Sequence, residues 1–152
     1  MENQGLVAGA MKILKENGKK QTKRREIIID YLARSNRYVS PKEIHLNLIK
    51  EYPGLSQDTI YRNLREFAEF GILEETELNG EMNFRFNCIH PSSKHHHHHF
   101  ICTNCGATKP LDLCPMTFYQ EQLPNCIIED HRFEIFGKCE KCVSLKQMGP
   151  FF

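Results

Sequence analysis

The sequence has 152 residues, a formal net charge of +1 and a hydrophobic content of 40%. This length predicts one or two small domains, and no apolar run approaches the roughly 18 residues of a transmembrane helix, which excludes an integral membrane protein. The N-terminal segment lacks the apolar core and cleavage site of a signal peptide. We therefore expect a cytoplasmic protein whose paired cysteines are metal ligands rather than disulfides.

The small net charge hides an asymmetry between the two halves of the chain. Residues 1–70 carry 13 Lys and Arg against 9 Asp and Glu, a balance of +4, whereas residues 71–152 carry 7 against 10, a balance of −3. The basic half has no cysteine, and all seven cysteines lie in the acidic half. This separation of positive charge from soft metal ligands indicates two domains with two tasks.

Four helices are predicted in the basic half. The first spans about residues 4–17, and Thr22, Ser40 and Ser56 are suitable N-cap residues for the other three. Pro41 follows Ser40 at the first helical position, which is a strong signal for the start of a helix.

The fourth helix, from Ser56 to Gly71, has an apolar stripe and a polar outer face. Four apolar residues fall at helical spacing and are expected to face the core: Ile60, Leu64, Phe67 and Ala68. Tyr61 and Arg62 lie off this stripe and project outward. Three short helices ending in such a helix are typical of a helix-turn-helix, whose recognition helix enters the major groove of DNA. An ordinary solvated helix face has the same pattern.

Residues 72–86 change to a period of two, and Asn79-Gly80 separates the two alternating segments as a hairpin turn. A hairpin directly after a recognition helix is a wing, so the pattern favours a winged helix-turn-helix over a solvated helix. Residues 87–94 break the pattern and contain Pro91-Ser92-Ser93, which predicts a linker between two domains.

Two C-x-x-C knuckles lie far apart in the acidic half, and their residues are Cys102, Cys105, Cys139 and Cys142. Two such knuckles supply four thiolates for one tetrahedral zinc ion, which would tie distant chain segments together. Cys114 and Cys126 belong to no knuckle, and we expect them to be small buried hydrophobic residues more often than ligands.

Five consecutive histidines precede the first knuckle, on a strand predicted over residues 95–102. Alternate side chains of a strand point to opposite faces, so His97 and His99 face one way while His96 and His98 face the other. One strand can therefore supply ligands to two separate metal sites.

The remaining elements are less regular. We expect a weak strand near residues 107–113, a helix from Pro115 to about Leu123 and a strand over residues 126–136. The tail after Cys142 is expected to be disordered.

A zinc hydrolase or deaminase is the rival interpretation of these ligands. Such an enzyme needs three protein ligands, a water and a nearby general base. The deaminase signature H-x-E with P-C-x-x-C is absent, as are a P-loop, an H-E-x-x-H motif and a nucleophile elbow. We therefore expect no enzyme and no small-molecule substrate.

The chain resembles the ferric uptake regulator superfamily of metal-dependent repressors, and within it the zinc uptake regulators. Five stretches carry the resemblance in the family's order, and they span nearly the whole chain: TKRRE at 22–26, PGLSQDTIYRNL at 53–64, GIL at 71–73, HHHFICTNCG at 97–106 and HRFEIFGKCEKC at 131–142.

The resemblance implies an α+β protein in three parts: a winged-helix DNA-binding domain over residues 1–86, a hinge over 87–94 and an α/β dimerisation and metal-binding domain over 95–152. It also implies a homodimer that responds to zinc, represses transcription from palindromic operator DNA and controls zinc uptake genes.

Three metal sites follow from the resemblance. The four knuckle cysteines match the structural zinc site. A regulatory zinc site matches Glu74, Cys88, His97 and His99, although the spacing after Cys88 also allows His95 to replace one of the two histidines. A third, less constant site matches His96, His98 and His131, and its carboxylate ligand has no clear counterpart in this chain.

The resemblance also assigns the DNA contacts. Tyr61 and Arg62 match positions that contact bases, whereas Ser56, Thr59 and Arg25 match positions near the DNA backbone.

An iron- or peroxide-sensing repressor of the same family is the alternative. Such relatives usually carry a histidine where this chain has Tyr38, and an aspartate or glutamate where it has Pro110. This chain instead offers the thiolate of Cys88, a soft ligand that favours zinc over iron or manganese.

Overall fold

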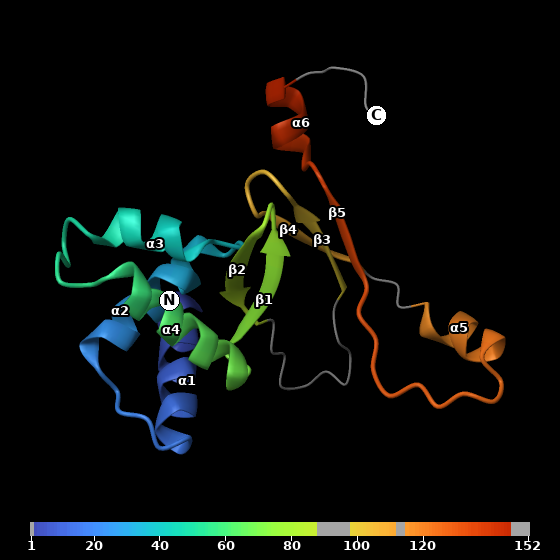
Figure 1. The fold of residues 1–152 in the computed structure, drawn as a ribbon, viewed down its shortest axis with the longest axis horizontal. Coiled ribbons are helices and arrows are strands. Elements are labelled where there is room, and N and C mark those ends of the chain that lie inside the picture. The colour runs from blue at the N-terminus through green and yellow to red at the C-terminus, as the bar shows by residue number, and fades with distance from the viewer. Residues whose placement is uncertain (1, 88–97, 112–114, 147–152) are drawn as a thin grey trace. The chain divides into compact units, whose positions relative to one another are not determined.

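The computed structural model of the protein describes residues 2–87, 98–111 and 115–146. Four helices followed by a β-hairpin form its N-terminal unit. The chain divides into two units, the N-terminal unit (residues 1–87) and the C-terminal unit (residues 88–152). The N-terminal unit contains α1 (Glu2–Glu16), α2 (Lys23–Ser35), α3 (Pro41–Leu48), α4 (Gln57–Glu69), β1 (Leu73–Leu78) and β2 (Glu81–Phe86) (Figure 1).

The predicted helix starts are confirmed by three side-chain caps. The hydroxyl oxygens of Thr22, Ser40 and Ser56 accept hydrogen bonds from backbone N–H groups three residues later, at the starts of α2, α3 and α4. Each cap satisfies an N–H that has no partner inside its own helix. Pro41 occupies the first turn of α3, as expected.

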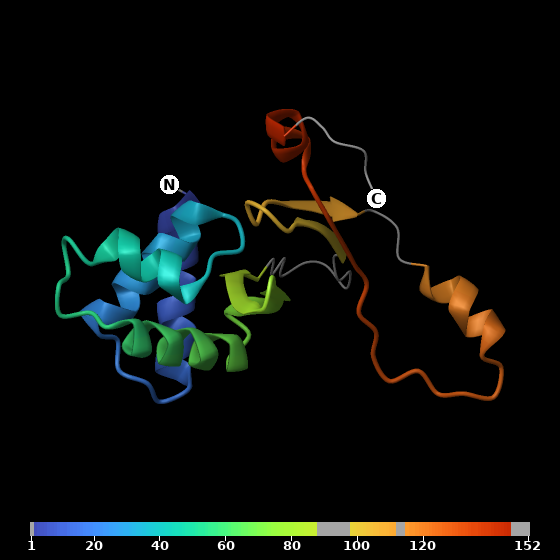
Figure 2. The ribbon, with the colours of Figure 1, turned by 45° about the horizontal axis from the view of Figure 1, so that its top comes forward.

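One hydrophobic core joins the helices to the hairpin. Helices α1 and α2 pack together, as do α3 and α4 (Figure 2). Fully buried side chains come from every helix and from the hairpin segment: Leu14, Ile28, Ile29, Leu32, Ile44, Ile60, Leu64, Phe67, Ile72 and Phe84. The stripe predicted for α4 faces this core, so the opposite face of α4 is left at the surface.

The hairpin is attached to the helices as well as to itself. Asn79 and Gly80 have positive φ angles of 53° and 84°, which a two-residue hairpin turn requires. Val39 and Phe84 exchange backbone hydrogen bonds of 2.9 and 2.8 Å, which join β2 to the segment before α3. The wing is therefore attached to the backbone between α2 and α3.

The C-terminal unit contains a three-stranded sheet in the order β4-β3-β5. Its elements are β3 (His98–Cys102), β4 (Thr108–Leu111), α5 (Met116–Gln122), β5 (Glu134–Gly137) and α6 (Glu140–Lys146) (Figure 1). Strand β3 pairs antiparallel with β4 and parallel with β5. Helices followed by strands in one unit, and mixed elements in the other, confirm the predicted α+β class.

The strand predicted over residues 126–136 is wrong for most of its length, because β5 covers only Glu134–Gly137. Strand β5 is paired where it lies beside His99–Cys102, whereas the residues before β5 have no described strand beside them. Ile127 is 91% exposed and Cys126 is also exposed, so Cys126 is not the buried residue we expected. Strand formation thus follows the available partner more than the local β-propensity.

The tail after Cys142 is also not what the sequence suggested, because α6 continues to Lys146. Glu140 lies in its first turn, where a carboxylate stabilises the helix dipole, and the Ser144 hydroxyl donates to the Glu140 carbonyl oxygen. None of the helices in the described residues is long and apolar enough to cross a bilayer.

Candidate metal centre and DNA-binding surface

The four knuckle cysteines lie together in the C-terminal unit. Their sulfur atoms are all within 4.8 Å of one another, and Cys102–Cys142 and Cys105–Cys139 are sulfur pairs 3.7 Å apart. A zinc ion with four Zn–S bonds of roughly 2.3 Å requires sulfur–sulfur edges of about 3.8 Å. Two of the six sulfur–sulfur edges therefore have the length that a closed tetrahedral zinc site requires, and the others are no longer than 4.8 Å.

Local backbone structure sets this spacing. Cys102 ends β3 and Cys105 lies in the tight turn before β4, where the Gly106 N–H donates to the Cys102 carbonyl oxygen at 3.0 Å. Cys139 precedes α6 and Cys142 lies in its first turn. The parallel pairing of β3 with β5 brings the two knuckles together, so the site depends on contacts between distant segments.

Nitrogen donors surround the sulfur atoms. The backbone N–H groups of Cys105 and Cys139 lie 3.5 and 3.4 Å from the Cys102 sulfur, and the Asn104 side-chain amide donates to the Cys142 sulfur at 3.2 Å. Such donors stabilise a thiolate. Asn104 was not identified from the sequence, because an asparagine inside a knuckle gives no signal of its own.

The cysteines differ in acidity. Burial opposes ionisation of Cys102, but hydrogen bonds from the backbone of Cys105, Cys139 and Asn104 outweigh it and lower the pKa of this thiol to about 6. Burial, together with the neighbouring thiols, raises the pKa of Cys105 to about 12. At neutral pH the metal-free cluster therefore holds one stabilised thiolate and at least one proton that a metal ion must displace.

Two histidines predicted as ligands lie side by side, His98 on β3 and His131 before β5. His98 is 5% exposed, and its Nε2 atom lies 3.3 Å from Nε2 of His131. Two nitrogens bound to one tetrahedral zinc at roughly 2.0–2.1 Å would lie about 3.4 Å apart. Phe133 packs edge-on against the His98 ring. The structure thus brings together two of the three predicted ligands of the third site, and His96 lies outside the described residues.

The residues predicted to form the regulatory site are described only in part, because Cys88, His95 and His97 lie outside the described residues. Glu74 belongs to β1, and its carboxylate oxygen Oε2 lies 3.5 Å from Nη1 of Arg85, whose side chain is 7% exposed. The guanidinium group of Arg85 lies over the ring of Tyr38, 5.8 Å from its centroid. His99 is 7% exposed on β3 and lies opposite Pro110 in the antiparallel register.

The predicted base-contacting residues lie on the outer face of α4. Tyr61 is 41% exposed and packs edge-on against Phe84 of β2, with ring centroids 6.5 Å apart. Arg62 forms a 2.7 Å ion pair with Asp58 one helical turn earlier. Both side chains are therefore at the surface, and the wing orients Tyr61.

The three residues predicted near the DNA backbone have internal partners. The Ser56 hydroxyl accepts from the Thr59 N–H at 3.1 Å and donates to the Thr59 hydroxyl oxygen at 2.9 Å. Arg25 donates to the Lys20 carbonyl oxygen at 2.6 Å, and its side chain is 19% exposed. These internal contacts thus stabilise the starts of α4 and α2, in addition to any contact with DNA.

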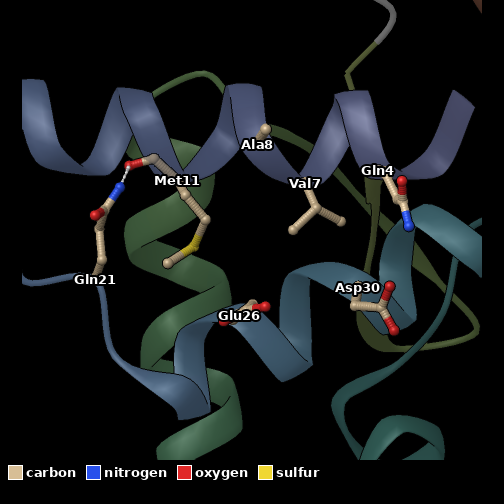
Figure 3. Close-up of a pocket in the computed structure, with 7 residues that line it drawn as sticks. All are labelled: Gln4, Val7, Ala8, Met11, Gln21, Glu26 and Asp30. Atoms are coloured by element: carbon tan, nitrogen blue, oxygen red, sulfur yellow. Dashed lines mark hydrogen bonds between the residues drawn. The ribbon is translucent and has the colours of Figure 1, made fainter. Parts of the chain in front are cut away.

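A different groove runs between α1 and α2 (Figure 3). The Gln21 side chain donates to the Met11 carbonyl oxygen across its end, at 3.1 Å. Its charged lining residues are Glu26 and Asp30, and none of the described residues lining it is a cation. Two carboxylates repel phosphate, so this groove does not fit DNA.

Comparison with known proteins explains this combination of sites. The model of the ferric uptake regulator family matches residues 16–136. The chain belongs to the ferric uptake regulator family. The ferric uptake regulation protein of Staphylococcus epidermidis is 49% identical over 133 residues, covering 88% of this chain and 93% of the relative. Its namesake in Staphylococcus aureus is 47% identical, covering 88% of this chain and 95% of the relative.

Solved structures share the fold of this family member. A zinc uptake regulator in complex with zinc and DNA has a TM-score of 0.71 at 22% identity, covering 95% of this chain and 97% of that chain. The ferric uptake regulator of Vibrio cholerae has a TM-score of 0.61 at 27% identity, covering 83% and 96%. Members of the ferric uptake regulator family are metal-binding, dimeric DNA-binding repressors and not enzymes, as the sequence indicated.

The acidity of the thiols predicts how metal binding to this family member depends on pH. Zinc, used as a probe ion, must displace the proton of Cys105, so its apparent affinity should fall by at least about tenfold for each pH unit below neutrality. Below about pH 6 the Cys102 thiolate also gains a proton, so the dependence should steepen.

Competition with a chromophoric chelator between pH 5 and 8, corrected for the protonation of the chelator, measures this dependence. Replacing the exposed Cys126 by serine is the matched control and should leave the curve unchanged. An affinity that does not change with pH would show that the thiols do not bind the ion.

Proposed function

We propose that the protein is a zinc-responsive transcriptional repressor that binds palindromic operator DNA as a homodimer in the cytoplasm and controls zinc uptake genes. The observation that carries the choice of zinc is Cys88, a cysteine that offers a soft thiolate ligand seven residues before the histidine run in the sequence. Residues 1–86 bind DNA, residues 87–94 are a hinge, and residues 95–152 form the dimerisation and metal-binding domain.

The N-terminal unit supports the DNA-binding part of this proposal. Helix α4 presents Tyr61 and Arg62 on its outer face, and β1 and β2 follow it as a wing. Arg65 of α4 makes two hydrogen bonds, of 3.1 and 2.8 Å, to the carboxylate of Glu75 in β1. This contact fixes the wing against the recognition helix, so both can contact DNA as one rigid element.

The C-terminal unit supports the homodimer. Several large apolar side chains of this unit are exposed in the single chain: Phe118, Tyr119, Leu123, Ile127, Phe133, Ile135 and Phe136. A monomer rarely exposes this much apolar surface, and a second copy of the chain would cover it. A dimer also presents two recognition helices, as a palindromic operator requires.

The four knuckle cysteines support a structural zinc ion. Their donor type, burial and spacing fit a closed site with no open position for a substrate. His98 and His131 support the third site, proposed for His96, His98 and His131, because their facing nitrogens offer one edge of a tetrahedron.

The regulatory ion is assigned to Glu74, Cys88, His97 and His99. Glu74 comes from the wing and His99 from β3, so one ion bound to all four residues would link the DNA-binding unit to the dimerisation unit. Glu74 now contacts Arg85, so the ion must share or break that ion pair. Zinc and operator should then bind with positive and reciprocal coupling.

Two replacements in the described residues also support zinc over iron. At the position where iron-sensing relatives usually carry a histidine, Tyr38 is 3% exposed and covered by Arg85. At the position of their carboxylate, Pro110 has no ligand atom in its side chain. Both replacements remove hard or borderline ligands suited to iron.

Iron is the second candidate effector, because the relatives that share 47–49% of their residues with this chain are named ferric uptake regulation proteins. Their identity with this chain extends over 133 residues, 88% of its length. A zinc sensor and an iron sensor would both be DNA-binding repressors. They differ in which metal ion activates DNA binding.

Operator binding across buffered free Zn²⁺ or, without oxygen, free Fe²⁺ separates the candidates. The operators are DNA duplexes selected from a random library in the presence of each metal. They are labelled after selection. We expect Zn²⁺ to activate binding at far lower free concentration than Fe²⁺. Cys88→Ser should keep the dimer and the structural zinc yet lose activation by zinc, whereas Cys126→Ser should match the parent protein. Activation by Fe²⁺, with Cys88→Ser unaffected, would instead identify an iron sensor.

Arg62→Ala should weaken binding to the selected operator by about 1–3 kcal/mol and relax the preference for one base pair, because a bidentate contact with a guanine edge is lost. The matched control is Arg34→Ala, which removes an arginine from a similar exposed i,i+4 pair on α2. Binding measured on the operator and on its single-base variants checks this. Equal losses on all duplexes would show that Arg62 does not contact a base.

A further inference from the structure

Lys19, Arg25 and Glu66 form a charged cluster where the connection between α1 and α2 meets α4. The ammonium group of Lys19 lies 3.4 Å, and Nη2 of Arg25 lies 3.8 Å, from the same carboxylate oxygen of Glu66. Glu66 comes from the recognition helix, 41 residues after Arg25 in the chain. One carboxylate therefore faces two cations that belong to another element.

Oxygen Oε1 of the Glu66 carboxylate is held by charge rather than by hydrogen bonds. This oxygen is buried and accepts no hydrogen bond from the described residues. Its two ion-pair distances exceed the roughly 2.7–2.9 Å of a charge-assisted hydrogen bond. A buried carboxylate oxygen without a hydrogen bond is poorly compensated for its lost hydration. Its cations can therefore exchange it for another anion at low cost.

Other ion pairs of α4 differ in this respect. Arg62 is hydrogen-bonded to Asp58 at 2.7 Å, but these side chains are 75% and 78% exposed, so solvent screens the pair. Arg65 is hydrogen-bonded to both carboxylate oxygens of Glu75, which fixes the wing. Of the acids Asp58, Glu75 and Glu66, only Glu66 neutralises cations that lie outside α4.

The surroundings of the cluster fit DNA phosphate. Lys20, Lys23 and Arg24 are exposed and adjoin Lys19 and Arg25 in the sequence, at the start of α2. Basic side chains bind the phosphate backbone of any DNA sequence and release counterions. The side chains of Lys19 and Arg25 would add to this patch if Glu66 did not hold them.

We propose that Glu66 is a brake on phosphate binding: it neutralises Lys19 and Arg25 in the unbound protein and so lowers the affinity for the DNA backbone. A phosphate must displace the carboxylate before both cations contribute. Because the brake acts on every sequence alike, it keeps DNA binding weak until base contacts and bound metal add to it. The inference rests on the proposed DNA-binding surface.

The test compares Glu66→Gln with Glu69→Gln in the metal-loaded protein. Both changes remove one negative charge from α4, and Glu69 is exposed and, among the described residues, forms no ion pair with Lys19 or Arg25. On a labelled random-sequence duplex, Glu66→Gln should raise affinity roughly 3- to 10-fold and steepen the salt dependence by about one phosphate contact. Affinity for the operator should rise by a similar factor.

A third variant separates release of the cations from a change in structure. In a protein with Lys19→Gln and Arg25→Gln, adding Glu66→Gln should have no further effect on either duplex. Unchanged helix content and thermal unfolding would confirm that Glu66→Gln folds like the parent.

Three results would overturn the proposal: equal effects of Glu66→Gln and Glu69→Gln, no effect of Glu66→Gln, or weaker binding by Glu66→Gln. If the parent still bound its operator in response to metal, the proposed function would stand without the brake. If the parent bound no operator at all, the proposed function itself would fail.

Discussion

The approach of the four knuckle sulfurs is the constraint on which the C-terminal unit depends. Among the described residues of this unit, the buried apolar side chains are Ile101 and three of the cysteines themselves. A unit of this size with so small a core has little hydrophobic stabilisation of its own. A thiolate-bound zinc ion can contribute about 10 kcal/mol or more to folding, which would compensate for the small core of the single chain.

The metal centre gathers four thiols in one place, whereas the N-terminal unit pairs its cations with carboxylates. Two of the cations that we propose to contact DNA are already paired with carboxylates: Arg62 with Asp58, and Arg25 with Glu66. Paired side chains keep a fixed geometry in the free protein, so less conformational entropy is lost when DNA binds. Each carboxylate also weakens the attraction for phosphate. The surface therefore combines a preformed shape with moderate charge, which suits a repressor whose affinity has to be controlled by a metal ion.

Much of this arrangement could be predicted because its signals are local. Thr22, Ser40 and Ser56 mark helix starts, Asn79-Gly80 marks the turn of the wing, and the i,i+3 spacing of each knuckle points to a metal. The contact of Glu66 with Lys19 and Arg25 could not be predicted, since it joins residues more than 40 positions apart. The true length of β5 was also missed, because it is set by pairing with β3 and not by the apolar run before it.

Hydrogen exchange measured residue by residue, with zinc bound and after its removal by a chelator, tests most directly whether the thiolate cage holds the C-terminal unit together. The informative amides are those of Cys102, Thr103 and Cys139, which donate to the Ala107 carbonyl oxygen, the Gly137 carbonyl oxygen and the Cys102 sulfur. Chelation should increase their exchange by orders of magnitude while the core amides of α2 and α4 stay protected. Equal protection of these three amides with and without zinc would contradict the account.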